Sequence, residues 1–212
     1  MPSARTRPES DVHDETPAPA AKPSSGANTR QRILDAANEL FYHHGIRATS
    51  ADRIIEQVGI TKVTFYRHFR AKSDLVVAYL EQQSAAEQTW MKSTVREGDA
   101  LATARRIAAG IGAASCSPGF RGCAFINAAA EYPDPADPVR VAVDAHRAWL
   151  IDFFSGIAGQ AGARDVTSVA NQLMILRDGA MVNGYLGDAP ALAGSLEAGF
   201  TAILGSVGGS GR

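Results

Sequence analysis

Polar side chains between Thr61 and Arg67 have the types and the spacing needed to read nucleic acid. Thr61, Lys62, Thr64 and Arg67 would point outward from one short predicted helix. Hydroxyl and positively charged side chains on one face can hydrogen bond to the edges of nucleobases in the major groove and pair with phosphates. For Lys62 the alternative is a solvated surface charge. The pattern therefore predicts a DNA-contacting helix face.

Catalytic and metal chemistry find little support in the sequence. The two cysteines, Cys116 and Cys123, are separated by six residues, which is not the close spacing of a zinc or redox pair. His43, His44 and His68 fall in the region of the predicted DNA-contacting helix. The sequence contains no phosphate-binding loop, dinucleotide-binding glycine pattern or His-x-x-x-His helix. We therefore expect no enzyme, no metal and no cofactor, and keep a small-molecule-binding enzyme as an alternative.

Short, closely joined helices must position this face. The pattern predicts a helix from Asn28 or Thr29 to Gly45, a second from Thr49 or Ser50 to Gly59, a third over about Thr61 to His68, and a longer one from near Lys72 to Trp90. Gly59 can end the second helix in a left-handed conformation, so the third follows with almost no linker. Two helices joined this tightly cross steeply, which is the helix-turn-helix geometry. The small core beneath them would contain Phe41, Ile54, Val58, Ile60, Phe65 and Phe69.

The rest of the chain is also helical in pattern. Segments fall near 99–115, 121–131, 136–160, 164–187 and 190–207, separated by proline or glycine, and no alternating strand pattern occurs. The expected fold class is all-α, with an N-terminal three-helix domain containing the helix-turn-helix over 28–73 and a larger helical bundle over 74–212. Residues 1–27 hold five of the ten prolines and almost no large apolar side chain, which predicts a disordered tail.

Charge is unevenly distributed along the 212 residues, although the net charge is only −1. Between Thr29 and Lys72 there are eight Lys or Arg and four Asp or Glu, whereas from Ser73 onward there are ten basic and fourteen acidic residues. A basic segment joined to an acidic body is expected where one end meets phosphates. Because no signal peptide or membrane-spanning run is present, we expect a cytoplasmic protein with reduced thiols and no membrane partner.

The stretch TSADRIIEQVGITKVTFYRHFRAKSDL, from Thr49 to Leu75, resembles the DNA-binding segment of the tetracycline-repressor (TetR) family. The matching positions, which continue back into the first helix as ILDAANELFYHHG, are Thr49, Asp52, Ile54, Gly59, Phe65, Tyr66, His68, Phe69 and Lys72. The resemblance covers roughly residues 29–75, and the body matches the family's all-helical layout and length. It implies three partners: a double-stranded DNA operator, a small-molecule effector and a second copy of the chain.

The resemblance also implies roles for individual residues. Thr49 would contact a phosphate at the start of the second helix, and Lys72 would bind phosphate at the start of the fourth. Tyr66 and His68 would lie on the DNA backbone, with ordinary surface packing as the alternative. The predicted DNA-binding residues are Thr49, Thr61, Lys62, Thr64, Tyr66, Arg67, His68 and Lys72.

The helical body would hold the effector. Within 136–160, His146 interrupts an apolar stripe, which indicates either a core histidine or a polar anchor in a pocket. The segment Arg121–Pro135 is rich in small residues, which favours either close helix packing or a pocket wall. The predicted ligand-binding residues are Phe120, Cys123, Phe125, His146, Trp149, Phe153, Met174, Asp178 and Met181.

The segment 164–187 is apolar on more than one side and must be covered on more than one side. With 190–207 it predicts a helix pair that packs against its twin in a four-helix interface, a monomeric core being the alternative. A two-fold dimer would place its reading helices one DNA turn, about 34–36 Å, apart. The predicted interface residues are Leu173, Leu176, Ala180, Leu192, Leu196, Phe200 and Ile203.

These patterns and the resemblance together predict a dimeric repressor that binds a palindromic operator and is released or retuned by a small molecule. The first alternative is a redox sensor that uses Cys116 and Cys123, although buried thiols are commonly inert. The second is a DNA-binding protein without a ligand. The sequence leaves open the effector, the operator, the regulated genes and the choice between repressor and activator.

Overall fold

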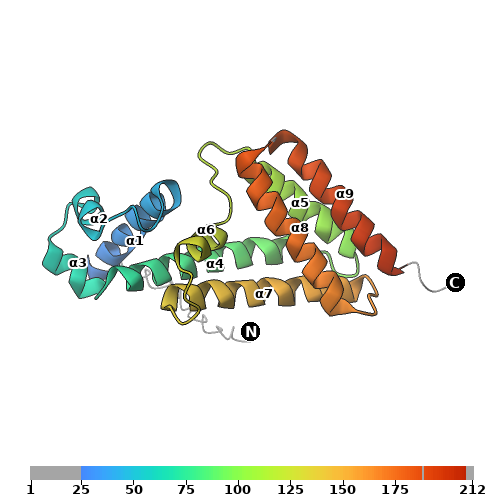
Figure 1. The fold of residues 1–212 in the computed structure, drawn as a ribbon, viewed down its shortest axis with the longest axis horizontal. Helices are drawn as coiled ribbons and strands as arrows, with labels where there is room; N and C mark the ends of the chain where they lie inside the picture. The colour runs from blue at the N-terminus through green and yellow to red at the C-terminus, as the bar shows by residue number, and fades with distance from the viewer. Residues whose placement is uncertain (1–24, 188, 209–212) are drawn as a thin grey trace, which may run out of the picture.

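The computed structural model describes residues 25–187 and 189–208. Within these ranges the chain forms helices and no strand, which confirms the all-α prediction (Figure 1). The helices are α1 Ser25–His44, α2 Ala51–Val58, α3 Lys62–His68, α4 Lys72–Thr94, α5 Ala100–Ser115, α6 Ala124–Glu131, α7 Pro138–Gln160, α8 Val166–Leu186 and α9 Ala189–Gly208. The first helix begins three residues earlier than predicted, so residues 25–27 are helical, and the rest of the predicted tail lies outside the described residues.

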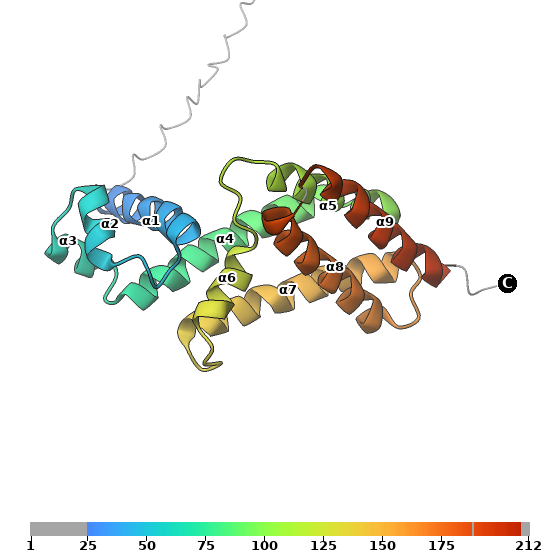
Figure 2. The ribbon, with the colours of Figure 1, turned by 45° about the horizontal axis from the view of Figure 1, so that its top comes forward.

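Helix α4 connects the two ends of an elongated molecule. Helices α1, α2 and α3 lie at its beginning, and α5 and α7 pack against it further along; α8 packs on α7, and α9 packs on α5 and α8 (Figures 1 and 2). One apolar core joins α1–α3 and the first turns of α4 to α6 and the start of α7, and a second core fills the space among α5, α7, α8 and α9. The first core therefore continues past Lys72 and includes Cys123, Phe125 and Val143 of the body.

Polar side chains fix where the helices of the body begin. Asp99, Asp137 and Asp165 each accept a hydrogen bond from a backbone N–H in the first turn of α5, α7 and α8, respectively. Pro138 occupies the first position of α7, where its missing N–H costs no hydrogen bond. Among the described helices, none is both long and apolar enough to span a membrane.

Candidate DNA-binding surface and inner cavity

Residues 59–61 hold α2 and α3 in a fixed helix-turn-helix. Gly59 adopts a left-handed conformation with φ of 70°, and its N–H donates to the carbonyls of Ile55 and Glu56. Ser50 caps α2 by accepting from the N–H of Arg53, and Thr61 caps α3 by accepting from the N–H of Thr64 at 3.1 Å. Each cap satisfies a backbone donor that would otherwise be unpaired at the helix start, which makes the turn rigid.

Phe65 anchors α3 to the other helices. Its side chain is fully buried, and its ring lies 6.2 Å from the ring of Phe69 and 5.2 Å from that of Tyr66. Ile54 and Val58 of α2 are buried in the same core, as the sequence pattern predicted. With one side of α3 fixed in this way, the opposite side must face solvent.

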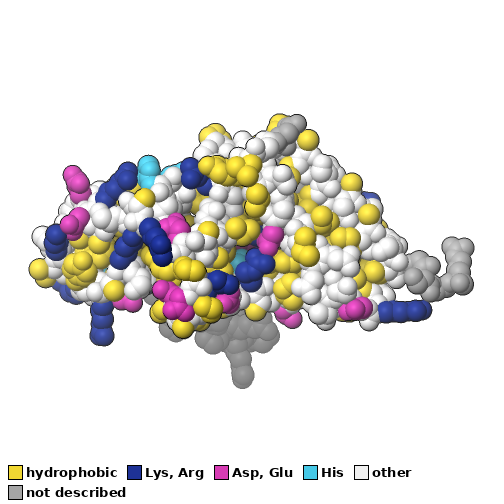
Figure 3. Space-filling view, viewed as in Figure 1, with side chains coloured by type: hydrophobic (Ala, Val, Ile, Leu, Met, Phe, Trp, Pro, Cys, Tyr) yellow, Lys and Arg dark blue, Asp and Glu magenta, His cyan; other side chains and the backbone are white. Residues whose placement is uncertain are grey.

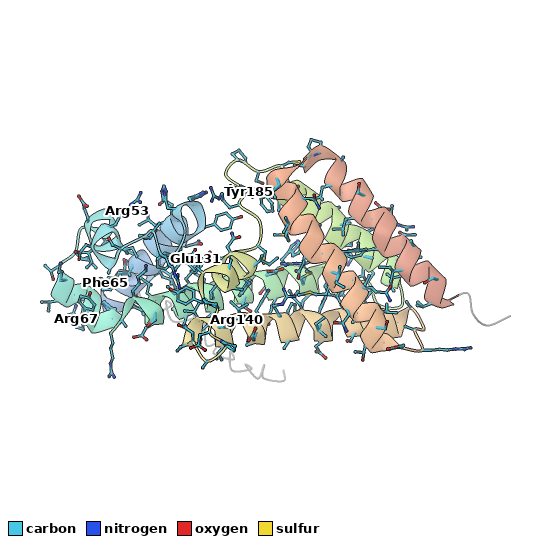
Figure 4. The ribbon with its side chains drawn as sticks, in the orientation of Figure 1. Arg53, Phe65, Arg67, Glu131, Arg140 and Tyr185 are labelled. Atoms are coloured by element: carbon cyan, nitrogen blue, oxygen red, sulfur yellow. The ribbon has the colours of Figure 1, made fainter. Side chains whose placement is uncertain are left out.

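The exposed side of α3 carries most of the predicted DNA-contacting residues. Lys62, Tyr66 and Arg67 are exposed, Thr64 is half-buried, and Val63 between them is 79% exposed. The Lys62 ammonium lies 2.9 Å from the carboxylate of Asp52, and this hydrogen bond raises the pKa of Lys62, so it is charged at neutral pH. Arg53 and Arg67 lie at the end of the molecule farthest from α9 (Figure 4), and basic side chains gather over this end (Figure 3).

Three predicted DNA contacts are placed differently. Thr49 is fully buried, and its hydroxyl donates to the carbonyl of Gly45 at 2.9 Å, so it closes the α1–α2 turn and does not face a phosphate. Lys72 begins α4 as predicted, but its ammonium donates to the carbonyl of Ile46, and burial lowers its pKa. His68 is half-buried, and its Nε2 atom has no hydrogen-bond partner.

A cavity of about 510 Å³ lies between the DNA-binding helices and the body. Its walls come from α1, α4, α5, α6, α8 and the segment before α6. Aromatic rings and small apolar side chains form much of this wall, including Trp90, Phe120 and Phe125. The polar and charged groups on the wall are supplied by Asn38, Tyr42, Gln83, Glu87 and Arg177.

A buried ion network crosses the cavity wall. Arg177 is 2% exposed; its Nη2 donates to Glu87, and its Nη1 donates to Asp178 Oδ1 at 3.1 Å and to Cys123 Sγ at 3.3 Å. Burial acts to lower the pKa of Arg177, but Cys123, Glu87 and Asp178 outweigh it and raise the pKa. Burial acts to raise the pKa of Glu87, but His146 and Arg177 outweigh it and lower the pKa. Both groups are therefore charged at neutral pH.

His146 lies behind this wall. Its ring stacks on that of Phe125, with 3.6 Å between centroids and 6° between planes. Its Nδ1 is 3.0 Å from the hydroxyl of Ser84, and its Nε2 is 3.2 Å from Glu87 Oε2. The imidazole thus supports Phe125 and Glu87 from the core side, which differs from the predicted pocket anchor.

The other predicted ligand-binding residues divide into two groups. Phe120, Cys123, Phe125 and Met181 line the cavity. Trp149, Phe153, Met174 and Asp178 do not line it; Met174 is buried in the second core, and Asp178 pairs with Arg147 and Arg177.

Sequence reasoning did not identify Arg177 and Glu87. Arg177 is the lone basic residue between Val166 and Leu186, and its place beside Asp178 after the apolar run Leu173–Leu176 could have indicated a buried ion pair. Nothing in the sequence indicated that Asn38 and Tyr42 line the cavity, because both belong to the helix assigned to DNA binding.

Two hydrogen-bonded contacts join α1 and the α1–α2 turn to α6. The Tyr42 hydroxyl accepts from the N–H of Arg121 at 2.9 Å and donates to the carbonyl of Gly122 at 2.9 Å, just before α6. At the other end of α6, the carboxylate of Glu131 accepts from the backbone N–H groups of Ile46 and Arg47. The segment before α6 and the end of α6 are therefore tied to α1 and the α1–α2 turn.

The outer face of α8 and α9 is uncharged. The charged side chains of α8 and α9 are Arg177, Asp178 and Glu197; Arg177 is buried, Asp178 pairs with Arg147, and Glu197 pairs with Arg105. On this face Ile175 is 70% exposed and Leu186 73%, and Figure 3 shows few charged side chains over these helices. The exposed small residues of α9 are Ala191, Gly194, Ser195, Ala198, Ala202, Gly205 and Ser206.

The predicted interface residues point the other way. Leu173, Ala180, Leu192, Leu196 and Phe200 are buried in the second core of one protomer, and Leu176 and Ile203 are partly buried against it. Helices α8 and α9 do pack against each other, and their exposed apolar residues lie on the outer face. The spacing of apolar residues did not distinguish the buried side of α8 and α9 from the outer side, because both sides carry apolar residues.

The two cysteines lie in different environments. Cys116 is exposed at the end of α5, Cys123 is buried before α6, and both thiols are free. A redox role for them stays a prediction.

Comparison with known proteins agrees with this geometry. The sequence model described as "Bacterial regulatory proteins, tetR family" matches residues 33–79. A TetR-family transcriptional regulator from Streptomyces coelicolor is 38% identical, with a TM-score of 0.81, over 86% of this chain and 97% of that one.

Two curated regulators match the N-terminal part of the chain. The HTH-type transcriptional regulator YvkB of Bacillus subtilis is 39% identical over 71 residues, which are 34% of this chain and 36% of that protein. The HTH-type transcriptional regulator AcrR of Shigella flexneri is 36% identical over 81 residues, which are 37% of this chain and 38% of that protein. The matched stretch thus spans little more than a third of either curated regulator.

Proposed function

Because this chain belongs to the TetR family of transcriptional regulators, we propose that it is a homodimeric, ligand-responsive repressor acting on a palindromic operator in the cytoplasm. The observation that carries the proposal is the exposed side of α3, where Lys62, Tyr66 and Arg67 stand on a helix fixed by Phe65 and the capped turn. Family members are regulators and not enzymes, so the enzyme alternative is set aside.

The cavity supports a ligand-driven change of state. Asn38 and Tyr42 of the DNA-binding part form its wall together with α4, α5 and α8, so a bound molecule would contact both parts at once. A ligand that binds one arrangement of these parts more tightly shifts the population towards that arrangement. A coupling of about 1–3 kcal/mol between ligand and operator is typical of such systems.

The uncharged face of α8 and α9 supports the homodimer. Contiguous exposed apolar side chains on a soluble domain commonly mark an interaction site. Two α8–α9 pairs packed about a two-fold axis would form the proposed four-helix interface, with Ile175, Val182 and Leu186 at its centre. The paired α3 helices would then lie at opposite ends of the dimer's DNA-facing side, where each can enter a major groove.

The Lys62→Ala variant tests the proposed DNA surface. We expect its affinity for the operator to fall about five- to tenfold, and the slope of log affinity against log salt to fall by about one per subunit, because one phosphate contact is lost. The measurement is fluorescence anisotropy with the full-length protein on DNA flanking its own gene, against scrambled DNA, at several salt concentrations.

Lys92→Ala is the matched control, since Lys92 is exposed near the far end of α4. Its affinity and salt slope should equal those of the unmodified protein. If Lys92→Ala weakened binding as much as Lys62→Ala, the loss would reflect overall charge, and the α3 surface would not be the DNA contact.

A further inference from the structure

We infer that the cavity takes an uncharged, planar molecule whose edge presents a hydrogen-bond donor beside an acceptor, as a carboxamide does. The inference rests on the proposed function, because it names the chemical class of the effector. Three features of the wall carry it: the ion network, a pair of amide side chains, and the aromatic rings.

The charged side chains of the cavity wall already form ion pairs with one another or with neighbouring residues. Arg177 donates to Glu87 and Asp178, Arg147 donates to the second oxygen of Asp178 at 2.8 Å, and His146 lies against the second oxygen of Glu87. An anionic ligand would have to take Arg177 from Glu87, and a cationic ligand would have to take Glu87 from Arg177. Either exchange breaks the buried Arg177–Glu87 pair and leaves Glu87 with only His146 or Arg177 with only Asp178, which is strongly unfavourable. A neutral ligand leaves the network intact.

Asn38 and Gln83 provide the polar edge that a neutral ligand can use. The two side-chain amides form one hydrogen bond, Gln83 Nε2 to Asn38 Oδ1 at 2.9 Å, and both line the cavity. Each amide has an NH2 group and a carbonyl oxygen, so this single bond leaves the NH2 group of Asn38 and the carbonyl oxygen of Gln83 available to a ligand. If the nitrogen and oxygen positions of both amides are exchanged, one NH2 group and one carbonyl oxygen are again available. A ligand with an adjacent acceptor and donor satisfies both groups at once.

Aromatic rings supply a flat wall for the rest of the ligand. Trp90, Phe120 and Phe125 line the cavity, and planar ligands bury much apolar area against such rings. Gly110 of α5 fits closely against Trp90, since a Cβ at this position would lie 2.3 Å from Trp90 Cζ2. The indole is therefore held as part of the wall, with little freedom to retreat into α5.

Three isosteric probes test the inference on the full-length protein: naphthalene-2-carboxamide, naphthalene-2-carboxylate and naphthalene-2-carboxamidine. They share one ring system and differ in being neutral, anionic and cationic at pH 7.5. By isothermal titration calorimetry we expect the carboxamide to bind at least about tenfold more tightly than either charged probe, because only the charged probes must break a buried ion pair. Equal or tighter binding of a charged probe, or the absence of saturable heat for all three, would overturn the inference.

The Gln83→Leu variant tests the amide edge. We expect it to weaken carboxamide binding about fivefold, the usual effect of losing one neutral hydrogen bond, and to bring the three probes closer together in affinity. Gln160→Leu, at the exposed end of α7, is the matched control and should bind all three probes as the unmodified protein does. Unchanged carboxamide affinity in Gln83→Leu would overturn the assignment of the edge.

The readouts keep this inference separate from the proposed function. Anisotropy of the ligand-free protein on DNA reports the regulator, and calorimetry reports the ligand class. Sequence-selective DNA binding together with preference for a charged probe would reject only the ligand class. Carboxamide preference in a protein without selective DNA binding would reject the regulator and leave the chemistry of the cavity standing.

Discussion

Replacing Arg177 with methionine lowers the free energy of unfolding by about 3–5 kcal/mol, the usual cost of removing one partner from a buried ion pair. The loss is large because Arg177 is almost fully buried and is shared by Glu87 and Asp178. Asp178 keeps Arg147, but Glu87 would keep only His146 beside it. The methionine side chain fills similar space, so the loss measures the charge and not a void. Chemical denaturation at one fixed protein concentration measures it.

An exposed ion pair in the same body gives the control. Arg105 pairs with Glu197 at 3.3 Å, and both side chains are about half exposed. Arg105→Met should change the free energy of unfolding by no more than about 1 kcal/mol, since exposed pairs contribute little. The double variant Glu87→Gln with Arg177→Met should recover part of the single variant's loss. If Arg177→Met were no more destabilising than Arg105→Met, the buried network would not have the energetic role assigned to it.

Replacing Ile175 with glutamate produces a monomer at concentrations where the unmodified protein is a dimer. The side chain is 70% exposed in the protomer and lies at the centre of the proposed two-fold interface, so each subunit would bury a carboxylate without a partner. Operator affinity should then fall by about 100-fold or more, because the second half-site is no longer bound intramolecularly. Size-exclusion chromatography with light scattering gives the mass, and anisotropy gives the affinity.

Val141→Glu is the matched control for the dimer prediction. Val141 is 55% exposed on α7, outside the α8–α9 face, so this variant should stay dimeric and bind the operator normally. Circular dichroism should show both variants fully helical. An Ile175→Glu protein that remained dimeric with unchanged affinity would show that the two subunits meet elsewhere.

The sequence predicted the DNA-binding helices closely because their signals are local. Gly59, the capping hydroxyls of Ser50 and Thr61, and the spacing of Ile54, Val58 and Phe65 each determine structure within a few residues of themselves. The structure has α2, α3 and the start of α4 within a residue or two of the predicted limits. The exposed side of α3 followed from the same spacing, since fixing Phe65 inside determines which residues lie outside.

The cavity and the outer face depend on contacts between distant segments, which periodicity does not report. Asn38 meets Gln83, and Arg177 meets Glu87, only because α1, α4 and α8 pack together. Thr49 matched the sequence motif for a surface contact, yet packing of the α1–α2 turn buries it. Helix α8 carries apolar residues on both sides, so hydrophobicity alone could not separate its buried side from its exposed outer side.

Selection of DNA from a random pool by the full-length dimer tests the central proposal most directly. The account predicts enrichment of one inverted repeat whose half-sites lie about one helical turn apart, with the Lys62→Ala protein enriching the same sequence more weakly. Failure of a folded, dimeric preparation to enrich any sequence would contradict the account, and the assignment of α2 and α3 as the DNA-binding element would have to be withdrawn.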